Sequence, residues 1–163
     1  MRCFLKKEYI EYARSKMIEF KLYGWSLSFN NGKKRLGVTK FPKREISISK
    51  YVLDSDDESV FREVFLHELA HAIDFERNGL RGGLQHDRVW SEICVSLGLI
   101  PKRTLPNNWI EKLGIKLNYT LSCNYCGYEN QKDRISFRKR YLCPCCLEER
   151  GAEIDLLINK NKP

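Results

Sequence analysis

The sequence of 163 residues contains no long hydrophobic run. A membrane-spanning helix needs about 18 or more consecutive apolar residues, and no window approaches that length. The first residues, MRCFLKKEYIEYARSKM, interrupt their apolar side chains with charge too often to resemble a secretory signal peptide. These absences disfavour a membrane protein and predict an intracellular one, cytoplasmic or nucleoid-associated and not secreted.

Histidine is also scarce. The chain has three histidines, and all of them fall in FLHELAHAIDFERNGLRGGLQHDRVW, residues 65–90. Cysteine is more frequent, but the seven cysteines are an odd number and five of them lie between positions 123 and 146. In a reducing compartment such close pairs indicate metal binding and disfavour a disulfide framework.

Acidic residues are few near both ends of the chain, and the formal charge is +8. Residues 1–50 carry 13 Lys and Arg against 4 Asp and Glu, and residues 101–163 carry 12 against 7, whereas residues 51–100 carry 4 against 10. A basic excess divided between two flanks suits a polyanion such as nucleic acid. A solvated lysine surface is the alternative interpretation.

Hydrophobic periodicity predicts an α+β fold. Apolar residues at three- and four-residue spacing predict a helix over residues 5–23. Alternating residues then predict two strands joined by an Asn31-Gly32 hairpin turn, and REISISKYV adds a third strand. We therefore expect a small three-stranded antiparallel sheet.

A long helix follows, with signals at both ends. Ser55 and Glu58 form a capping box at its start, and Arg77-Asn78-Gly79 supplies a cation and a stop signal at its end. A glycine-rich loop and a shorter helix, HDRVWSEICVSLG, come next. The whole pattern predicts a zincin-like helix on a small sheet.

The long helix contains the motif H-E-x-x-H, formed by His67, Glu68 and His71. Residues four apart project from one helical face, so two imidazoles can bind one zinc ion while Glu68 reaches a water molecule as the general base. A third ligand is required. His86 is the first candidate, because the glycine-rich loop can return it to the metal, and Glu92 is the alternative. Without a metal, the histidines would be ordinary surface or core residues.

Two Cys-x-x-Cys pairs lie 16 residues apart in the C-terminal part of the chain: Cys123 with Cys126, and Cys143 with Cys146. Four thiolates around a zinc ion leave no position for water, so this site is predicted to be structural. Cys145 is an alternative ligand to Cys146. The spacing predicts a C-terminal zinc ribbon.

The motifs divide the chain into a catalytic domain over residues 1–116, a ribbon over 117–150 and a tail over 151–163. Between the cysteine pairs, basic and aromatic residues are interleaved, which suits phosphate binding and base stacking on single-stranded or distorted DNA. The alternative is that Phe137 and Tyr141 form the small core of the ribbon. The candidate DNA contacts are Arg134, Arg138, Lys139 and Arg140.

This order of elements resembles the SprT-like family of zinc metalloproteases, which includes Spartan, a protease of DNA–protein crosslinks. The resemblance covers roughly residues 1–150 and rests on FLHELAHAIDF, QHDRVW and the paired cysteines. It implies that residues 1–116 form a SprT-like metalloprotease domain with Glu68 as catalytic base. It also implies two zinc ions, one catalytic and one structural, with the first bound by His67, His71 and His86.

The resemblance further implies a DNA-dependent protease that cleaves DNA-bound or DNA-crosslinked proteins, and we expect a monomer without membrane contact. One departure is Asp87, where the family usually has glycine. Two other functions stay open: a non-enzymatic zinc-ribbon DNA-binding or regulatory protein, and a zinc hydrolase of another substrate class. The presence of Glu68 argues against the first, because a structural zinc needs only ligands.

Overall fold

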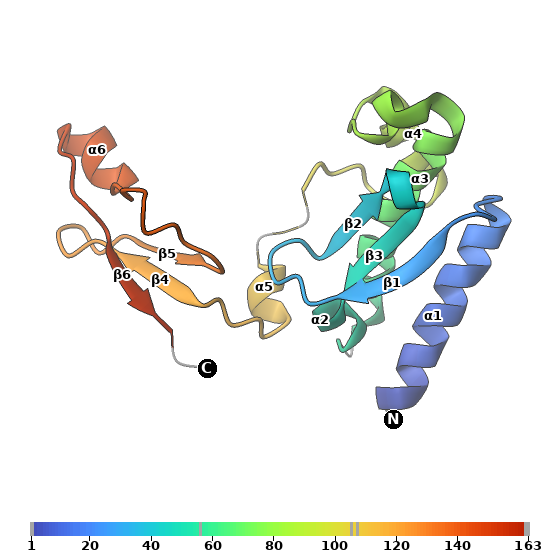
Figure 1. The fold of residues 1–163 in the computed structure, drawn as a ribbon, viewed down its shortest axis with the longest axis horizontal. Coiled ribbons are helices and arrows are strands. Elements are labelled where there is room, and N and C mark those ends of the chain that lie inside the picture. The colour runs from blue at the N-terminus through green and yellow to red at the C-terminus, as the bar shows by residue number, and fades with distance from the viewer. Residues whose placement is uncertain (1, 56, 105, 107, 162–163) are drawn as a thin grey trace. The chain divides into compact units, whose positions relative to one another are not determined.

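The computed structural model describes residues 2–55, 57–104, 106 and 108–161 (Figure 1). The chain forms two compact units, Met1–Leu113 and Gly114–Pro163. Each unit has its own three-stranded sheet, so the fold is mixed α+β. None of the described helices has the length and apolar character that a bilayer crossing requires.

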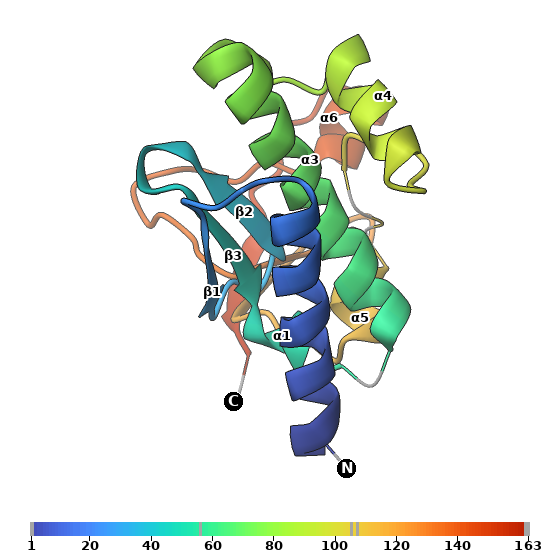
Figure 2. The same ribbon diagram turned by 90° about the vertical axis from the view of Figure 1, so that its right-hand side faces the viewer.

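Helix α1 (Arg2–Glu19) packs along the long helix α3 (Glu58–Gly83), as Figure 2 shows. Tyr9 and Ala13 are buried at the four-residue spacing that predicted a helix here. The ring of Tyr9 stacks on Phe61 of α3 with centroids 4.7 Å apart. This packing attaches α1 to the helix that carries the H-E-x-x-H motif.

The sheet of the first unit is mixed, with strand order β1-β3-β2. Its strands are β1 (Ser26–Asn30), β2 (Gly37–Lys40) and β3 (Glu45–Ser49). β3 pairs antiparallel with β2 and parallel with β1. The predicted Asn31-Gly32 hairpin and the antiparallel sheet are therefore wrong. A different hairpin is present: β2 and β3 are joined through the short helix η1 (Phe41–Lys43).

Burial explains why β3 takes the centre of the sheet. Ile46 and Ile48 are buried on one face of β3, and Ser47 and Ser49 are buried on the other. β1 and β2 are mostly half-buried, and α3 contacts both β2 and β3. A central strand has both backbone edges paired, so it is the strand best shielded from water. The most buried strand, β3, therefore lies between β1 and β2.

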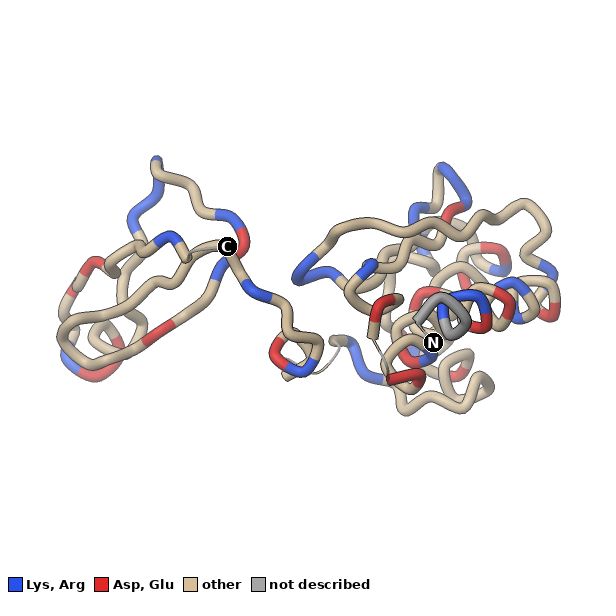
Figure 3. The backbone as a smooth tube through the Cα atoms, turned by 90° about the horizontal axis from the view of Figure 1, so that it is seen from below, with Lys and Arg blue, Asp and Glu red and all other residues tan. Residues whose placement is uncertain are grey.

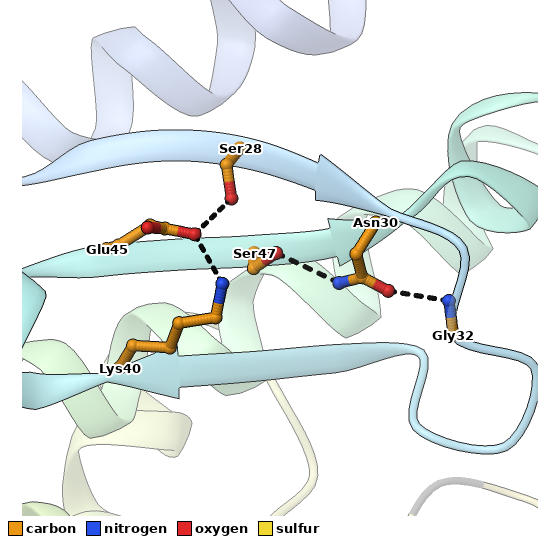
Figure 4. Close-up of polar contacts among 6 residues, drawn as sticks. All are labelled: Ser28, Asn30, Gly32, Lys40, Glu45 and Ser47. Carbon is orange, nitrogen blue, oxygen red and sulfur yellow. Dashed lines mark hydrogen bonds and ion pairs between the residues drawn. The ribbon is translucent and has the colours of Figure 1, made fainter.

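Polar side chains reinforce this order on the sheet (Figure 4). The Glu45 carboxylate on β3 accepts hydrogen bonds of 2.5 Å from Ser28 on β1 and from Lys40 on β2. At the end of β1, the Asn30 side chain accepts a bond of 2.7 Å from the backbone N–H of Gly32. This local turn begins the segment that carries the chain across the end of β3 to β2.

Helix α3 differs from its prediction at both ends. Its N-cap is Asp57, whose side chain accepts a bond from the Ser59 N–H, so the predicted capping box from Ser55 does not form. At Gly79 the backbone leaves helical geometry, with φ of 73° and ψ of −168°, and the helix then resumes to Gly83. The predicted glycine-rich loop is therefore mostly the last turn of a kinked helix.

Three shorter helices complete the first unit: α2 (Lys50–Leu53), α4 (Arg88–Ser96) and α5 (Trp109–Lys112). Asp87, at the position where the sequence departs from the SprT-like pattern, is the N-cap of α4 and accepts a bond of 3.1 Å from the Trp90 N–H. Capping gives Asp87 a structural role immediately after His86.

The second unit contains strands β4 (Tyr119–Ser122), β5 (Glu129–Lys132) and β6 (Leu157–Lys160), and helix α6 (Pro144–Arg150). Its strand order is β5-β4-β6, with both pairs antiparallel. Within the predicted tail over 151–163, residues 157–160 form β6. Pairing with β4 satisfies backbone groups that a free tail would expose to water.

Candidate functional site

The three histidines converge at one point of the first unit. His67 and His71 project from the same face of α3, and His86 lies between α3 and α4. The Nε2 atom of His86 is 3.2 Å from that of His71 and 3.4 Å from that of His67. Nitrogens bound to one tetrahedral zinc at about 2.0–2.1 Å lie roughly 3.3 Å apart, so the three donors fit zinc.

A backbone carbonyl fixes the tautomer of His71. Its Nδ1 lies 2.9 Å from the carbonyl oxygen of Gly83. Because a carbonyl only accepts, Nδ1 carries the proton and Nε2 presents its lone pair to the other histidines. The kink at Gly79 turns the end of α3 so that Gly83 can make this contact.

The buried indole of Trp90 packs against all three imidazoles. Its ring centroid lies 5.0 Å from that of His67, 5.3 Å from that of His71 and 4.5 Å from that of His86. Trp90 is 1% exposed, so it fills the space behind the ligands. In the sequence, Trp90 belongs to the motif QHDRVW, and its spacing of four residues from His86 was the available signal for a role at this site.

The Glu68 carboxylate lies between α3 and β2. The hydroxyl of Thr39 donates a bond of 2.8 Å to its Oε2 atom. A Cβ atom added to Gly37 would lie 2.6 Å from Glu68 Cγ, so glycine is needed for this close approach. Neither Thr39 nor Gly37 was predicted, because the incorrect hairpin gave no reason to bring β2 to the helix.

Burial changes the protonation of these groups. It raises the pKa of Glu68 to about 7, against the opposing effect of the Thr39 hydrogen bond. Burial also lowers the pKa of His67 and of His71 to about 4, with the neighbouring imidazoles adding to the effect. The two helix histidines are therefore neutral at pH 7, which is the form that binds a metal.

The alternative third ligand, Glu92, lies outside the histidine cluster. Its Oε1 accepts a bond of 2.8 Å from Arg88 Nε one turn earlier on α4. Three imidazoles therefore form the donor set among the described residues, and Glu68 faces the same cavity of about 590 Å³. Three neutral nitrogen ligands beside a carboxylate and an open cavity suit a metal that activates water.

The second unit brings together the four predicted cysteines: Cys123, Cys126, Cys143 and Cys146. The Sγ atoms of Cys123 and Cys146 are 3.8 Å apart, and those of Cys126 and Cys143 are 3.4 Å apart. These distances fit four thiolates around one zinc at about 2.3 Å. Cys145 is half-buried and lies outside this group.

The thiols of the second unit have divergent proton affinities. The backbone N–H of Cys126 lowers the pKa of Cys123 to about 7, whereas removal from water raises the pKa of Cys146 to about 12. Four adjacent thiols cannot all ionise without a cation between them, and a zinc ion would supply that charge. The donor set thus fits a closed metal centre.

The predicted DNA contacts of the second unit have different environments. Arg140 is not free, because it forms a bidentate pair with Asp155 at 3.0 Å. Arg134, Arg138 and Lys139 are exposed. Phe137 is 81% exposed, so it does not form the core of the ribbon. Basic and acidic residues occur in both units (Figure 3), so neither unit is purely basic.

Comparison with known proteins identifies a matching family. The sequence model of the SprT-like family matches residues 5–108, a segment that contains all three histidines and Glu68. No curated protein and no solved structure matches the chain. The cysteine cluster of the second unit lies beyond the matched segment.

Proposed function

Since the chain belongs to the SprT-like family, we propose that it is a zinc-dependent metallopeptidase of the H-E-x-x-H type that cleaves DNA-bound or DNA-crosslinked proteins. The observation that carries this proposal is the convergence of three imidazole nitrogens beside a buried carboxylate in one cavity. A structural metal site needs neither the carboxylate nor the cavity.

His67, His71 and His86 would hold zinc, which supplies a Lewis acid that activates water and polarises a carbonyl group. Glu68 takes the proton of the attacking water and delivers it to the leaving amine. The Thr39 hydroxyl holds the carboxylate in position for both steps. A pKa of about 7 suits a group that must accept and donate a proton near neutral pH.

The peptide substrate pairs with the free edge of β2. An added strand needs an unpaired edge, and β3, which contains the sequence EISIS, is central with both its edges occupied. β2 is an edge strand, and Leu36 to Thr39 line the cavity beside Glu68. Backbone pairing of this kind holds an extended peptide with little sequence preference.

DNA is proposed to bind the second unit through Arg134, Arg138 and Lys139, with Phe137 as a stacking platform. Their exposure supports this role. Neutralising Arg138 and Lys139 should weaken binding of single-stranded DNA and reduce its salt dependence, whereas Arg140→Gln, at a paired arginine, should have less effect. A flat salt response of the wild type would remove nucleic-acid binding from the proposal.

The decisive experiment combines zinc content with cleavage of a DNA-binding protein, with and without single-stranded DNA. We expect two zinc ions per chain in the wild type and in Glu68→Gln, and DNA-stimulated cleavage in the wild type alone. Glu92→Gln is the matched control and should retain activity. Two zinc ions without cleavage would favour the alternative of a zinc-ribbon DNA-binding protein, which the exposed basic residues of the second unit also support.

A further inference from the structure

The cavity beside the three histidines has a basic wall. Lys34, Arg35 and Arg103 line it, and Glu68 is the one carboxylate among the lining residues that the structure describes. Lys34 and Arg35 lie just before β2, whereas Arg103 lies on the segment that follows α4. Cations therefore approach the centre from two different segments of the chain.

Arg35 and Arg103 have no carboxylate partner within the described part of the chain. Several other arginines are paired, such as Arg62 with Glu58 and Arg140 with Asp155. Two guanidinium groups that line the same cavity give it a positive potential that attracts an anionic group. A guanidinium binds a carboxylate through two parallel hydrogen bonds, so a carboxylate suits both of them.

Ser49 forms hydrogen bonds to the backbone on both sides of Arg35, at Gly32 and at Leu36. The Ser49 hydroxyl donates a bond of 2.6 Å to the Gly32 carbonyl, and the Ser49 N–H donates a bond of 2.7 Å to the Leu36 carbonyl. Leu36 is itself buried. The backbone at Arg35 is thus fixed at the wall of the cavity, which limits the entropy lost when its side chain binds a ligand.

The position of Arg35, just before β2, indicates which part of a substrate would meet it. Gly37 lies against the Glu68 side chain, since a Cβ added there would be 2.6 Å from Glu68 Cγ, and Arg35 precedes it by two residues. At about 3.3 Å per residue, this separation is roughly 7 Å along an extended chain. A peptide paired with β2 would therefore place a side chain about two positions from the scissile bond beside Arg35.

We infer that Arg35 and Arg103 form a carboxylate-binding subsite of the peptide cavity, so that the protein preferentially cleaves peptide bonds within a few residues of Asp or Glu. This inference rests on the proposed peptidase function and specifies its substrate class. Basic DNA-binding proteins would be cut in their acidic segments. The subsite acts on ground-state binding, so it should change KM more than kcat.

The first test is a cleavage profile of the full-length zinc-loaded protein on a peptide library, with single-stranded DNA present. Asp and Glu should be enriched within three residues of the cleaved bonds. Replacing both Arg35 and Arg103 by Gln should reduce the kcat/KM advantage of a Glu peptide over its Gln counterpart roughly fivefold to tenfold. Arg14→Gln, which removes an exposed charge from α1, should leave it unchanged.

A binding measurement separates this inference from the peptidase proposal. Glu68→Gln protein should bind a peptide containing Glu more tightly than the Gln counterpart, with a difference that shrinks as salt increases and disappears in the double arginine variant. Equal binding of the two peptides, or a preference that survives the double substitution, would overturn the inference even if cleavage depends on Glu68. So would arginine substitutions that weaken single-stranded DNA binding but leave the peptide preference intact. If the protein binds the Glu peptide more tightly in a salt-sensitive way but shows no Glu68-dependent cleavage, only the proposed peptidase function would be refuted.

Discussion

At the scale of single residues, the proposed chemistry of the first unit depends on how the Glu68 carboxylate is held. Two neighbours on β2 control it: Gly37 permits the close approach, and Thr39 donates a hydrogen bond. Both contacts are local, yet neither residue lies near Glu68 in the sequence. The need for glycine at position 37 and a hydroxyl at position 39 becomes clear only when β2 is placed against α3.

Thr39→Val should lower kcat/KM roughly tenfold or more, because a hydrogen bond to a charged group contributes about 1.5–3 kcal/mol and Val keeps the volume of Thr. Thr39→Ser, which retains the hydroxyl, should keep most of the activity. Steady-state kinetics with unchanged zinc content in both variants would check this result. Equal activities for Val and Ser would mean that the hydroxyl has no part in positioning Glu68.

His86→Ala should lose one zinc ion per chain, whereas Glu92→Ala should keep two, because only His86 lies within reach of the other imidazoles. Metal analysis of the purified proteins measures this directly. The opposite pattern would assign the third ligand to Glu92. The cysteine centre serves as the internal reference, since both variants should retain its zinc.

At the scale of elements, the kink in α3 determines the position of the third histidine. The backbone at Gly79 adopts a conformation that is open essentially to glycine alone, and no atom lies within 4 Å of the place its Cβ would take. The kink therefore comes from the backbone of this residue. It lets the end of α3 return the Gly83 carbonyl to His71.

Gly79→Ala should introduce backbone strain of about 1–3 kcal/mol and favour a straighter helix, which would move His86 away from the other ligands. We expect weaker zinc binding at the histidine centre with the cysteine centre unaffected. Gly98→Ala is the matched control, because Gly98 also has a positive φ of 78° and open space around it but lies beyond α4. Zinc titration of both variants, together with thermal unfolding, distinguishes general strain from loss of the ligand.

The sheet illustrates what periodicity can and cannot predict. Alternation predicted strands near β1, β2 and β3, and Ile46 and Ile48 are indeed buried. The Asn31-Gly32 dipeptide suggested a turn between neighbours, but turn preference is a weak local signal. The free energy gained by burying both faces of β3 exceeds this turn preference. That gain depends on contacts between residues far apart in the sequence.

At the scale of the whole molecule, we expect the two units to rely on metal to different degrees. The core of the first unit consists of aromatic and aliphatic residues from α1, α3 and the sheet. The second unit buries Cys123, Cys143 and Cys146 against partly buried side chains such as Tyr128 and Ile154. So small a core usually needs a metal to fold.

A strong zinc chelator should therefore unfold the second unit and leave the first unit folded. Hydrogen exchange should show loss of protection in β4 and retained protection in the buried part of α3. Cys146→Ser should reproduce the loss without chelator, whereas Cys145→Ser should not, because Cys145 lies outside the cluster. Retained protection of β4 after complete zinc removal would contradict a folding role for the metal.

The sequence alone determined the α+β class, the long helix with His67 and His71 on one face, the family and the four cysteines, because helical periodicity and ligand spacing are local properties. The tertiary structure decided the strand order, the choice of His86 over Glu92 as a member of the histidine cluster, and the contacts of Glu68 with Gly37 and Thr39. It also brought Arg35 and Arg103 to one cavity. These outcomes depend on which segments, far apart in the sequence, pack against one another. Residue spacing carries little information about that packing.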